Sequence, residues 1–423
     1  MQIVMMTNTY LPMVGGVSRS VAGFAQAFRA AGHRVLVVAP TFPGTPPTED
    51  DVARMPAIQR FYGSEFSVGL PVPGMLLPRL ERFAPDIIHA HHPFLLGDTA
   101  LRSAAHFNVP AVFTHHTMYE HYTHYVPGNS PAMRQFAAAL ATEFANLCDH
   151  VIAPSGSIAE ILRRRGVTVP ITAIPSGIDL GRFATAQGPR GRITCGIPPN
   201  ARVVGHVGRL TKEKNLGFLA RAVARVLRKR PDAWFLVVGS GPAEAEIRIA
   251  CEAAEVAGRL LLAGRLDNQE LADAYAAMDV FAFASLSETQ GLVLAEAMAA
   301  GIPGVAIDAP GARDVLIDGV NGRLLETADE EVFATATVDL LDLPTQRLDD
   351  FRCQARATAA SLAMPICAER VLRLYESLLG GGHRGAIHDP SPWAAGLRRL
   401  DEEWNLLAGK GAALLRTESP ADA

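Results

Sequence analysis

The fold is decided by residues 1–39, which read MQIVMMTNTY LPMVGGVSRS VAGFAQAFRA AGHRVLVVA. An apolar run at residues 3–6 leads into a loop that contains glycines. An amphipathic stretch over residues 18–31, Gly32 and a second apolar run at residues 35–39 follow. This order predicts a parallel βαβ unit: a strand, then an amphipathic helix that ends at a glycine, then a second strand.

The same alternation continues along the chain and then starts again. Further apolar runs lie at residues 87–88, 109–114 and 151–153. A segment rich in Gly and Pro, residues 175–200, precedes a second series at residues 203–207, 235–238, 260–263, 280–284 and 305–307. This pattern predicts two doubly wound, Rossmann-like α/β domains, residues 1–185 and 195–362, whose strand ends face an interdomain cleft. Residues 381–423 differ in character and are expected to form a C-terminal extension.

Composition narrows the classes of function. The chain has 423 residues with 39 basic and 43 acidic side chains, and it has no dense Lys/Arg stripe, so nucleic acid is not expected as a partner. Its five cysteines form no C-x-x-C pair, which fits a reducing, cytoplasmic location. The start lacks a basic leader, and no apolar stretch approaches about 20 residues. Any membrane contact is therefore expected to be peripheral.

The most informative motif is SLSETQGLVLAEAM, residues 285–298, directly after a predicted strand. Gly291 is expected to begin a helix whose free amides, those of Leu292 and Val293 among them, point at a phosphate. Glu296, one turn further, would accept hydrogen bonds from ribose hydroxyls, and Glu288 would accept them from the sugar beyond the diphosphate. The alternative is that both acids are solvated surface charges.

Two other loops follow predicted strands. Gly15 and Gly16 precede the first helix and would let a phosphate or a reacting oxygen approach the backbone, although a flexible turn explains them equally well. The stricter G-x-G-x-x-G pattern is missing, which argues against nicotinamide binding. Arg209 and Lys214 follow the first strand of the second domain and suit a diphosphate leaving group; the alternative is a solvated basic turn.

Histidines gather near two strand ends of the first domain, and a run of His, Tyr and Glu follows them. Zinc binding is the less favoured interpretation, because the H-E-x-x-H and His-x-x-x-His spacings are absent. Polar tips on aromatic surfaces suit a sugar and acceptor site, although some of these histidines could be satisfied core residues. The candidate residues on the acceptor side are His92, Tyr119, Glu120, His121, Tyr122, His124 and Tyr125.

Together these motifs resemble glycosyltransferase family 4, the retaining GT-B enzymes, up to about Leu379. The resemblance rests on Gly15-Gly16-Val17, His116-Thr117, Pro175-Ser176-Gly177-Ile178-Asp179, Gly208-Arg209 with Lys214, Glu288 with Glu296, and Asp318-Gly319-Val320-Asn321-Gly322. It implies that Gly15, Gly16 and His116 lie beside the donor sugar. Arg209 and Lys214 would bind the diphosphate, Glu288 the sugar and Glu296 the ribose. The backbone at Arg265 and Leu266 would meet the base, and a helix near residues 365–380 would return to the first domain.

Within that family, residues 113–127 and 91–97 look most similar to the enzymes that transfer glucose to diacylglycerol in an α linkage. Those enzymes carry a strongly basic amphipathic helix for anionic lipid. The corresponding stretch here, residues 132–147, has Arg134 as its one cation against Glu143, and Arg163-Arg164-Arg165 is a partial substitute. This departure concerns the lipid acceptor and leaves the transfer chemistry unchanged.

The expected reaction moves a hexosyl group from a nucleotide diphosphate sugar, glucose from UDP-glucose, to the hydroxyl of a lipid, 1,2-diacylglycerol, with retention at the anomeric carbon. The expected catalytic residues are His116, Arg209, Lys214 and Glu288. No cofactor is expected. No metal ion is expected either, because Arg209, Lys214 and the helix amides would meet the charge of the diphosphate, and the absence of an Asp-x-Asp motif agrees with this. The alternatives are an inositol lipid, a polyprenyl lipid or a saccharide as acceptor, a nucleotide-sugar epimerase, and a noncatalytic sensor of sugar nucleotides.

Residues 397, 400, 404 and 407 place three leucines and a tryptophan on one face of a predicted C-terminal helix. That face could lie on a membrane or dock onto the first domain. Docking is the favoured interpretation, because the charges of the helix are mixed in sign.

Overall fold

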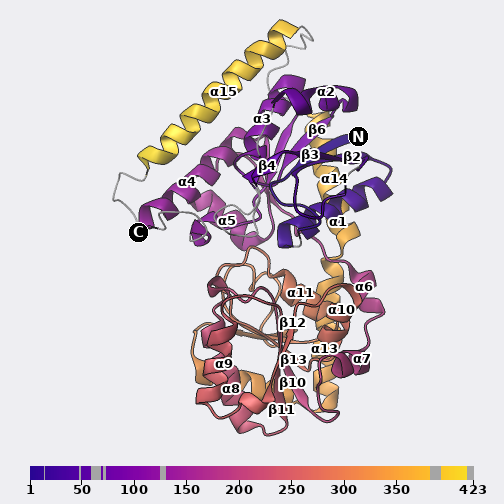
Figure 1. Cartoon of the computed structure of the whole chain (residues 1–423), viewed down its shortest axis with the longest axis vertical. Coiled ribbons are helices and arrows are strands. Elements are labelled where there is room, and N and C mark those ends of the chain that lie inside the picture. The colour runs from indigo at the N-terminus through magenta and orange to yellow at the C-terminus, as the bar shows by residue number, and fades with distance from the viewer. Residues whose placement is uncertain are drawn as a thin grey trace. The chain divides into compact units, whose positions relative to one another are not determined.

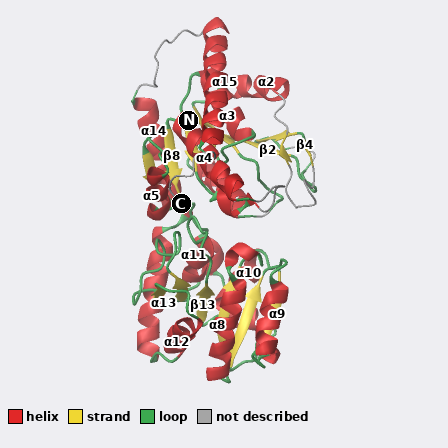
Figure 2. Cartoon of the chain, turned by 90° about the vertical axis from the view of Figure 1, so that its left-hand side faces the viewer, coloured by secondary structure: helices red, strands yellow, loops and turns green. Residues whose placement is uncertain are grey.

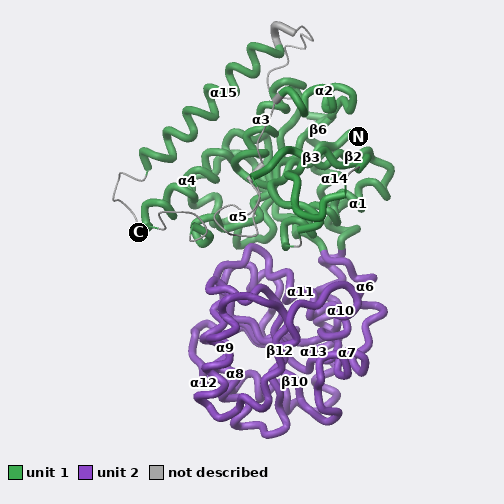
Figure 3. The backbone as a smooth tube through the Cα atoms, in the orientation of Figure 1, with its two compact units in different colours: residues 1–177, 364–423 green, residues 178–363 purple. Residues whose placement is uncertain are grey.

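The computed structural model describes residues 1–13, 15–46, 49–58, 68–69, 73–123, 130–381 and 392–416. The chain divides into two compact units, residues 1–177 with 364–423, and residues 178–363 (Figure 3). Each unit is an α/β domain built on a parallel sheet (Figures 1 and 2).

The seven-stranded sheet of the first unit has the order β3-β2-β1-β6-β7-β8-β9, and all of its neighbouring strands are parallel. Its strands are β1 (Gln2–Met6), β2 (Arg34–Pro40), β3 (Val52–Met55), β6 (Ile87–Ala90), β7 (Ala111–Thr114), β8 (His150–Ala153) and β9 (Ile171–Ala173). The predicted βαβ unit is confirmed, since α1 (Gly16–Ala30) joins β1 to β2. A two-stranded antiparallel ribbon, β4 (Ala57–Ile58) with β5 (Val68–Gly69), lies outside this sheet.

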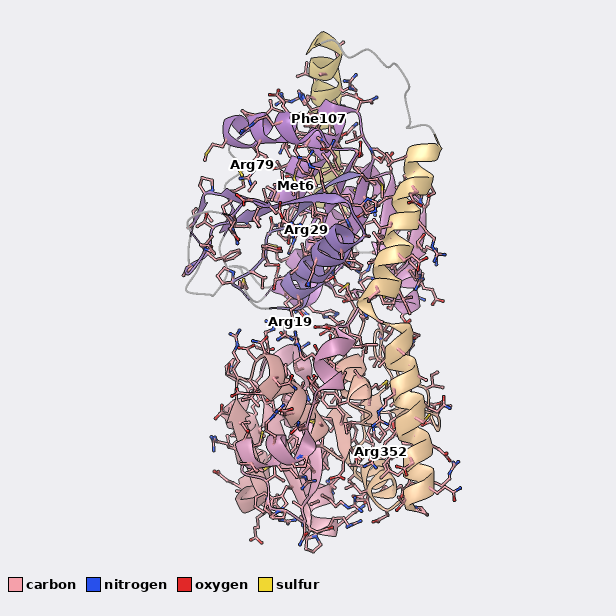
Figure 4. All side chains as sticks on the ribbon, turned by 90° about the vertical axis from the view of Figure 1, so that its right-hand side faces the viewer. Met6, Arg19, Arg29, Arg79, Phe107 and Arg352 are labelled. Carbon is pink, nitrogen blue, oxygen red and sulfur yellow. The ribbon has the colours of Figure 1, made fainter. Side chains whose placement is uncertain are left out.

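Both faces of this sheet are apolar and covered, which is why its strands read as continuous hydrophobic runs rather than alternating ones. Met6 of β1 (Figure 4) and its neighbour Met5 are fully buried and belong to separate apolar clusters, since successive strand residues point to opposite faces of a sheet. The covering helices are α1, α2 (Pro73–Phe83), α3 (Leu96–Phe107), α4 (Pro131–Leu147), α5 (Gly156–Arg164), α14 (Met364–Gly380) and α15 (Pro392–Leu415).

The six-stranded sheet of the second unit has the order β12-β11-β10-β13-β14-β15. Its strands are β10 (Arg202–Val207), β11 (Ala233–Val238), β12 (Leu260–Gly264), β13 (Val280–Phe283), β14 (Gly304–Ile307) and β15 (Gly322–Leu325), and neighbouring strands are parallel. The helices are α6 (Leu180–Ala184), α7 (Gly188–Thr194), α8 (Leu216–Lys229), α9 (Glu244–Ala253), α10 (Asn268–Ala276), α11 (Leu292–Ala299), α12 (Glu330–Leu341) and α13 (Thr345–Ser361).

The second unit begins at residue 178, earlier than the sequence pattern suggested. The reason is that α6 and α7 pack against α10, and Arg190 forms an ion pair with the buried Asp273 of α10. The chain returns to the first unit at residue 364, where α14 packs against α1 and buries Tyr375 completely.

The last helix, α15, packs against α3 and α4 (Figure 1). It docks through Leu406 and Ala413, which are 3% and 0% exposed. The expected docking face was therefore the wrong one. Leu397, Leu400, Trp404 and Leu407 point away from the unit and are 50–71% exposed, because the opposite side of the helix packs against α3 and α4 through Leu406 and Ala413.

Candidate active site

The carboxyl ends of β10 and β13 lie side by side in the second unit, where the strand order reverses direction. In open α/β sheets ligands bind at such a switch point, outside the carboxyl ends of the strands. The loop after β10 carries Arg209 and Lys214, and the loop after β13 carries Glu288 and Gly291. The sheet topology thus brings the expected phosphate-binding and sugar-binding loops to one edge.

Lys214 and Glu288 form an ion pair across this switch point, with a hydrogen bond from Nζ to Oε1. Both side chains are mostly buried, at 15% and 17% exposed. Burial alone would raise the pKa of Glu288, but the Lys214 ammonium and its hydrogen bond hold that pKa below the ordinary value. The two groups were expected to contact different parts of the donor, and the structure instead joins them as one charged unit.

Arg209 forms an ion pair with Glu213 at 3.1 Å. The arginine is about half exposed, whereas the glutamate side chain is only 4% exposed. Sequence reasoning missed Glu213, because Lys212-Glu213-Lys214 has the alternating charges of a solvated turn. The backbone carbonyl of Glu213 also accepts hydrogen bonds from Ser285 and Ser287, which ties the loop after β10 to the loop after β13.

Helix α11 begins as expected after Gly291. This glycine has a φ of +69°, in the left-handed region, and a Cβ here would lie 3.0 Å from the carbonyl oxygen of Gly311. The first turn of α11 contains no acidic side chain, so the amides of Leu292 and Val293 lie at a helix start suited to an anion.

Glu296 lies one turn into α11 and is half-buried. Its Oε2 accepts a hydrogen bond of 2.8 Å from the hydroxyl of Tyr275, which is fully buried on α10. Sequence reasoning missed Tyr275, because it belongs to no motif and reads as an ordinary core aromatic. Its hydroxyl orients the carboxylate that was expected to bind ribose.

Arg265 and Leu266 follow β12 at the same edge of the sheet. The Arg265 side chain is exposed and lies 3.4 Å from Asp267, while Leu266 packs partly against the core. They are placed three strands from β13 in the sheet order, where a base at the far end of a nucleotide could reach them.

The first unit has its own switch point between β1 and β6. After β1, the backbone amide of Asn8 donates to Nδ1 of His92, at 3.1 Å. A nitrogen that accepts from a backbone amide carries no proton, so the proton of the neutral His92 ring lies on Nε2. Burial agrees with this assignment, because it lowers the pKa of His92 to about 3.

His116 follows β7 and pairs with a residue that sequence reasoning did not assign. Its Nε2 lies 2.9 Å from Nδ1 of His91, and both rings are buried. Burial first, and then the neighbouring histidines, hold the pKa values of His91 and His116 well below the ordinary range. The pair is therefore uncharged and shares one hydrogen bond.

The remaining candidates in the first unit lie in the segments after β1 and after β7. Gly15 caps α1, and its amide donates to Ser18 Oγ at 2.8 Å, while Gly16 is the first residue of α1. Tyr119 and Glu120 belong to a short 3-10 turn, and His121 is exposed at its end. The structure places Tyr122 directly after that turn. His124 and Tyr125 lie outside the described residues.

Glu120 forms an ion pair with Arg165, with side chains 13% and 25% exposed. This pair changes two expectations. Glu120 faces an arginine rather than an open acceptor surface, and the cluster Arg163-Arg164-Arg165 loses one cation to an internal contact. Because a paired guanidinium has its charge neutralised locally, the cluster offers less attraction to anionic lipid than its sequence suggested.

No group of three or more His, Cys, Asp or Glu side chains within the described ranges is arranged to hold a metal ion. Among the helices in the described part of the chain, none combines the length and the apolar character that crossing a bilayer demands.

Comparison with known proteins agrees with this arrangement. A sequence model named Glycosyltransferase Family 4 matches residues 14–182, and one named Glycosyl transferases group 1 matches residues 201–343. A GDP-mannose-dependent alpha-mannosyltransferase of Mycolicibacterium smegmatis is 30% identical over 386 residues, covering 90% of this chain and 98% of that protein. An alpha-monoglucosyldiacylglycerol synthase of Acholeplasma laidlawii is 27% identical over 361 residues, covering 78% and 86%.

The fold is also similar to that of a solved structure. The solved structure of a sucrose-phosphate synthase from Thermosynechococcus elongatus superposes with a TM-score of 0.72 at 21% identity, covering 90% of this chain and 99% of that one. The two parallel sheets and this likeness show the GT-B fold. The chain belongs to glycosyltransferase family 4 and is a hexosyltransferase.

Proposed function

We propose that this hexosyltransferase moves glucose from UDP-glucose to the hydroxyl of 1,2-diacylglycerol and retains the α configuration. The observation that carries sugar transfer is the buried Lys214–Glu288 pair beside the start of α11. It combines a cation and helix amides for a diphosphate with a carboxylate for sugar hydroxyls. The glucosyl donor and the diacylglycerol acceptor are supported by the likeness to the Acholeplasma alpha-monoglucosyldiacylglycerol synthase.

In the proposed reaction the bond between the anomeric carbon and the diphosphate oxygen breaks, and the acceptor oxygen bonds to that carbon on the same face. The acceptor proton passes to a phosphate oxygen. Arg209, Lys214 and the amides of Leu292 and Val293 would stabilise the charge that develops on the diphosphate. Glu296 would bind the ribose, and Glu288 the transferred sugar.

The proposal also assigns roles to the candidate residues outside the loops after β10 and β13. Arg265 and Leu266 would meet the base. The roles of Gly15, Gly16 and His116 beside the donor sugar, and of His92 on the acceptor side, stay proposals that rest on the family resemblance. The neutral Nε2–H of His92 is a suitable donor for a hydroxyl oxygen.

Mannosyl transfer from GDP-mannose is the second candidate. It is favoured by the mannosyltransferase relative, which this chain matches over 98% of that protein's length. Glucose and mannose differ in the orientation of one hydroxyl, so the Lys214–Glu288 pair suits either sugar.

To test this, the purified full chain is incubated with UDP-glucose or with GDP-mannose. Each donor is tried without vesicles and with vesicles that contain diacylglycerol or phosphatidylinositol. Mass spectrometry of the lipids and of the sugar nucleotides then identifies the products. Hexosyl-diacylglycerol formed from UDP-glucose supports the proposal, whereas mannosylated product formed only from GDP-mannose favours the second candidate. An altered sugar nucleotide without any acceptor would indicate an epimerase, and binding without turnover would indicate a sensor.

A further inference from the structure

Helix α15 carries an apolar stripe that faces away from the unit on which it docks. Six of the exposed large hydrophobic side chains in the described chain belong to this one helix, with exposed fractions of 50–71%: Leu397, Leu400, Trp404, Leu407, Leu414 and Leu415. From Leu397 to Leu414 the numbers advance in steps of three and four, with Gly411 at the intervening position, and Leu415 follows directly. This spacing is the a and d pattern of a helix that pairs with another helix.

The docked face and the apolar stripe lie on opposite sides of α15. Leu406 and Ala413 bury the inner face against α3 and α4. Two ion pairs also connect α15 to α3: Glu403 pairs with Arg102 at 2.8 Å, and Lys410 pairs with Asp98 at 2.6 Å. The stripe is therefore held in place on a fixed helix, and a contiguous exposed apolar surface of this kind marks an interaction site.

The charges of α15 favour a protein partner over an anionic membrane. The helix has three cations, Arg398, Arg399 and Lys410, and three acids, Asp401, Glu402 and Glu403. Helices that lie on anionic lipid have a basic excess along the polar flanks of the apolar face. Here Glu403 and Lys410, one acid and one base, flank the same side of the stripe.

We propose that α15 is the interface with a second copy of this chain, and that the two helices pair antiparallel. This alignment places Leu397 opposite Leu414 of the second copy and Trp404 opposite its Leu407. It also brings Glu403, whose side chain is 47% exposed in its pair with Arg102, beside the 40% exposed Lys410 of the second copy, so that the ion pairs of the two copies join into one network. The two-fold symmetry repeats each contact. A parallel pair would instead place Trp404 against Trp404 and would bring neither Glu403 nor Lys410 beside an opposite charge of the second copy.

The first test is sedimentation velocity of the full chain over a range of protein concentrations. Wild type is expected to be a dimer, and Trp404→Glu is expected to be a monomer with an unchanged melting temperature. Ile249→Glu serves as the control, because Ile249 is an equally exposed apolar residue, 63% exposed, on α9. The proposal is overturned if the wild-type protein is a monomer at every concentration. It is also overturned if the wild-type protein is a monomer that co-floats with phospholipid vesicles and Trp404→Glu abolishes this co-flotation.

Cysteine cross-linking tests the register without relying on a destabilising change. In a Cys353→Ser background, which removes the exposed native thiol, the double variant Leu397→Cys/Leu414→Cys is expected to form a covalent dimer under mild oxidation. Each single variant is expected to stay monomeric on a denaturing gel. Cross-linking by Leu397→Cys alone would show a parallel pair and overturn the antiparallel arrangement.

Discussion

The Lys214 ammonium and the Glu288 carboxylate lie in contact at the switch point of the second unit, although 74 residues separate them in the chain. One follows β10 and the other follows β13, and these strands are neighbours in the sheet. Because both side chains are mostly buried, neither charge is stable there alone. The pair therefore offers an ammonium group that suits phosphate and a carboxylate that suits hydroxyl groups, in a ligand that carries both.

Replacement of Lys214 is expected to lower transfer strongly and also to lower stability, because it leaves the mostly buried Glu288 carboxylate without its cation. Lys214→Ala should lower the rate of transfer by roughly two to three powers of ten, the effect of losing one preorganised stabiliser of developing charge. Lys212→Ala is the matched control, since Lys212 lies in the same 3-10 turn and is exposed. Initial rates with labelled sugar nucleotide measure both, and equal rates in the two variants would contradict the role of Lys214.

Arg209 is expected to make a separate contribution of similar size. Arg209→Ala should lower transfer by roughly two powers of ten, because a planar guanidinium at a diphosphate supplies two hydrogen bonds as well as charge. Arg209→Lys should recover only part of that loss. A fully active Arg209→Ala variant would show that the arginine serves its ion pair with Glu213 and nothing else.

The hydrogen bond from Tyr275 to Glu296 is expected to set affinity for the donor. Tyr275→Phe removes a bond of 2.8 Å and keeps the ring that fills the core. A loss of about 1 kcal/mol of binding free energy should raise the KM for the sugar nucleotide roughly fivefold and should leave kcat little changed. Tyr375→Phe, an equally buried tyrosine in the first unit, is the control. A donor KM that is the same in both variants would refute the link.

The buried histidines predict how stability depends on pH. Burial lowers the pKa of His92 and His115 to about 3 and that of His206 to about 4. The unfolded chain takes up these protons near pH 6.5 and the folded chain does not, so stability is complete above that pH and falls below it. His115→Asn should make this decline shallower by up to about 1.4 kcal/mol per pH unit. Chemical denaturation at several pH values measures the free energy of unfolding of both proteins. Equal pH dependence in wild type and His115→Asn would contradict the lowered pKa of His115.

The Arg165–Glu120 pair is expected to serve stability. Arg165→Ala leaves a carboxylate that is only 13% exposed without its cation, and unfolding should become easier by about 1–3 kcal/mol. Arg164→Ala, at an exposed neighbouring position, should stay within about 0.5 kcal/mol of wild type. If the double variant Arg165→Ala/Glu120→Gln fails to recover stability, the unpaired charge is not the cause.

The sequence predicted the parts of the structure that depend on local pattern. The βαβ start and the helix after Gly291 follow from apolar runs and glycine positions, which are short-range signals. The partners of the candidate residues could not be predicted in this way. The contacts of Lys214 with Glu288, and of His91 with His116, depend on which strands become neighbours in the sheet.

The C-terminal helix shows the same limit. Its apolar stripe was visible in the spacing of leucines, but that spacing does not say which side of the helix contacts the first unit. The smaller face, with Leu406 and Ala413, fits α3 and α4, so the larger stripe remains outside.

Calorimetric titration of UDP and GDP into the full chain tests the central claim most directly, because it measures diphosphate binding apart from any acceptor. Saturable binding of at least one nucleotide is expected for wild type and for Lys212→Ala, with an affinity roughly tenfold or more weaker for Lys214→Ala. Equal affinity in all three proteins would contradict the claim that the loops after β10 and β13 hold the diphosphate.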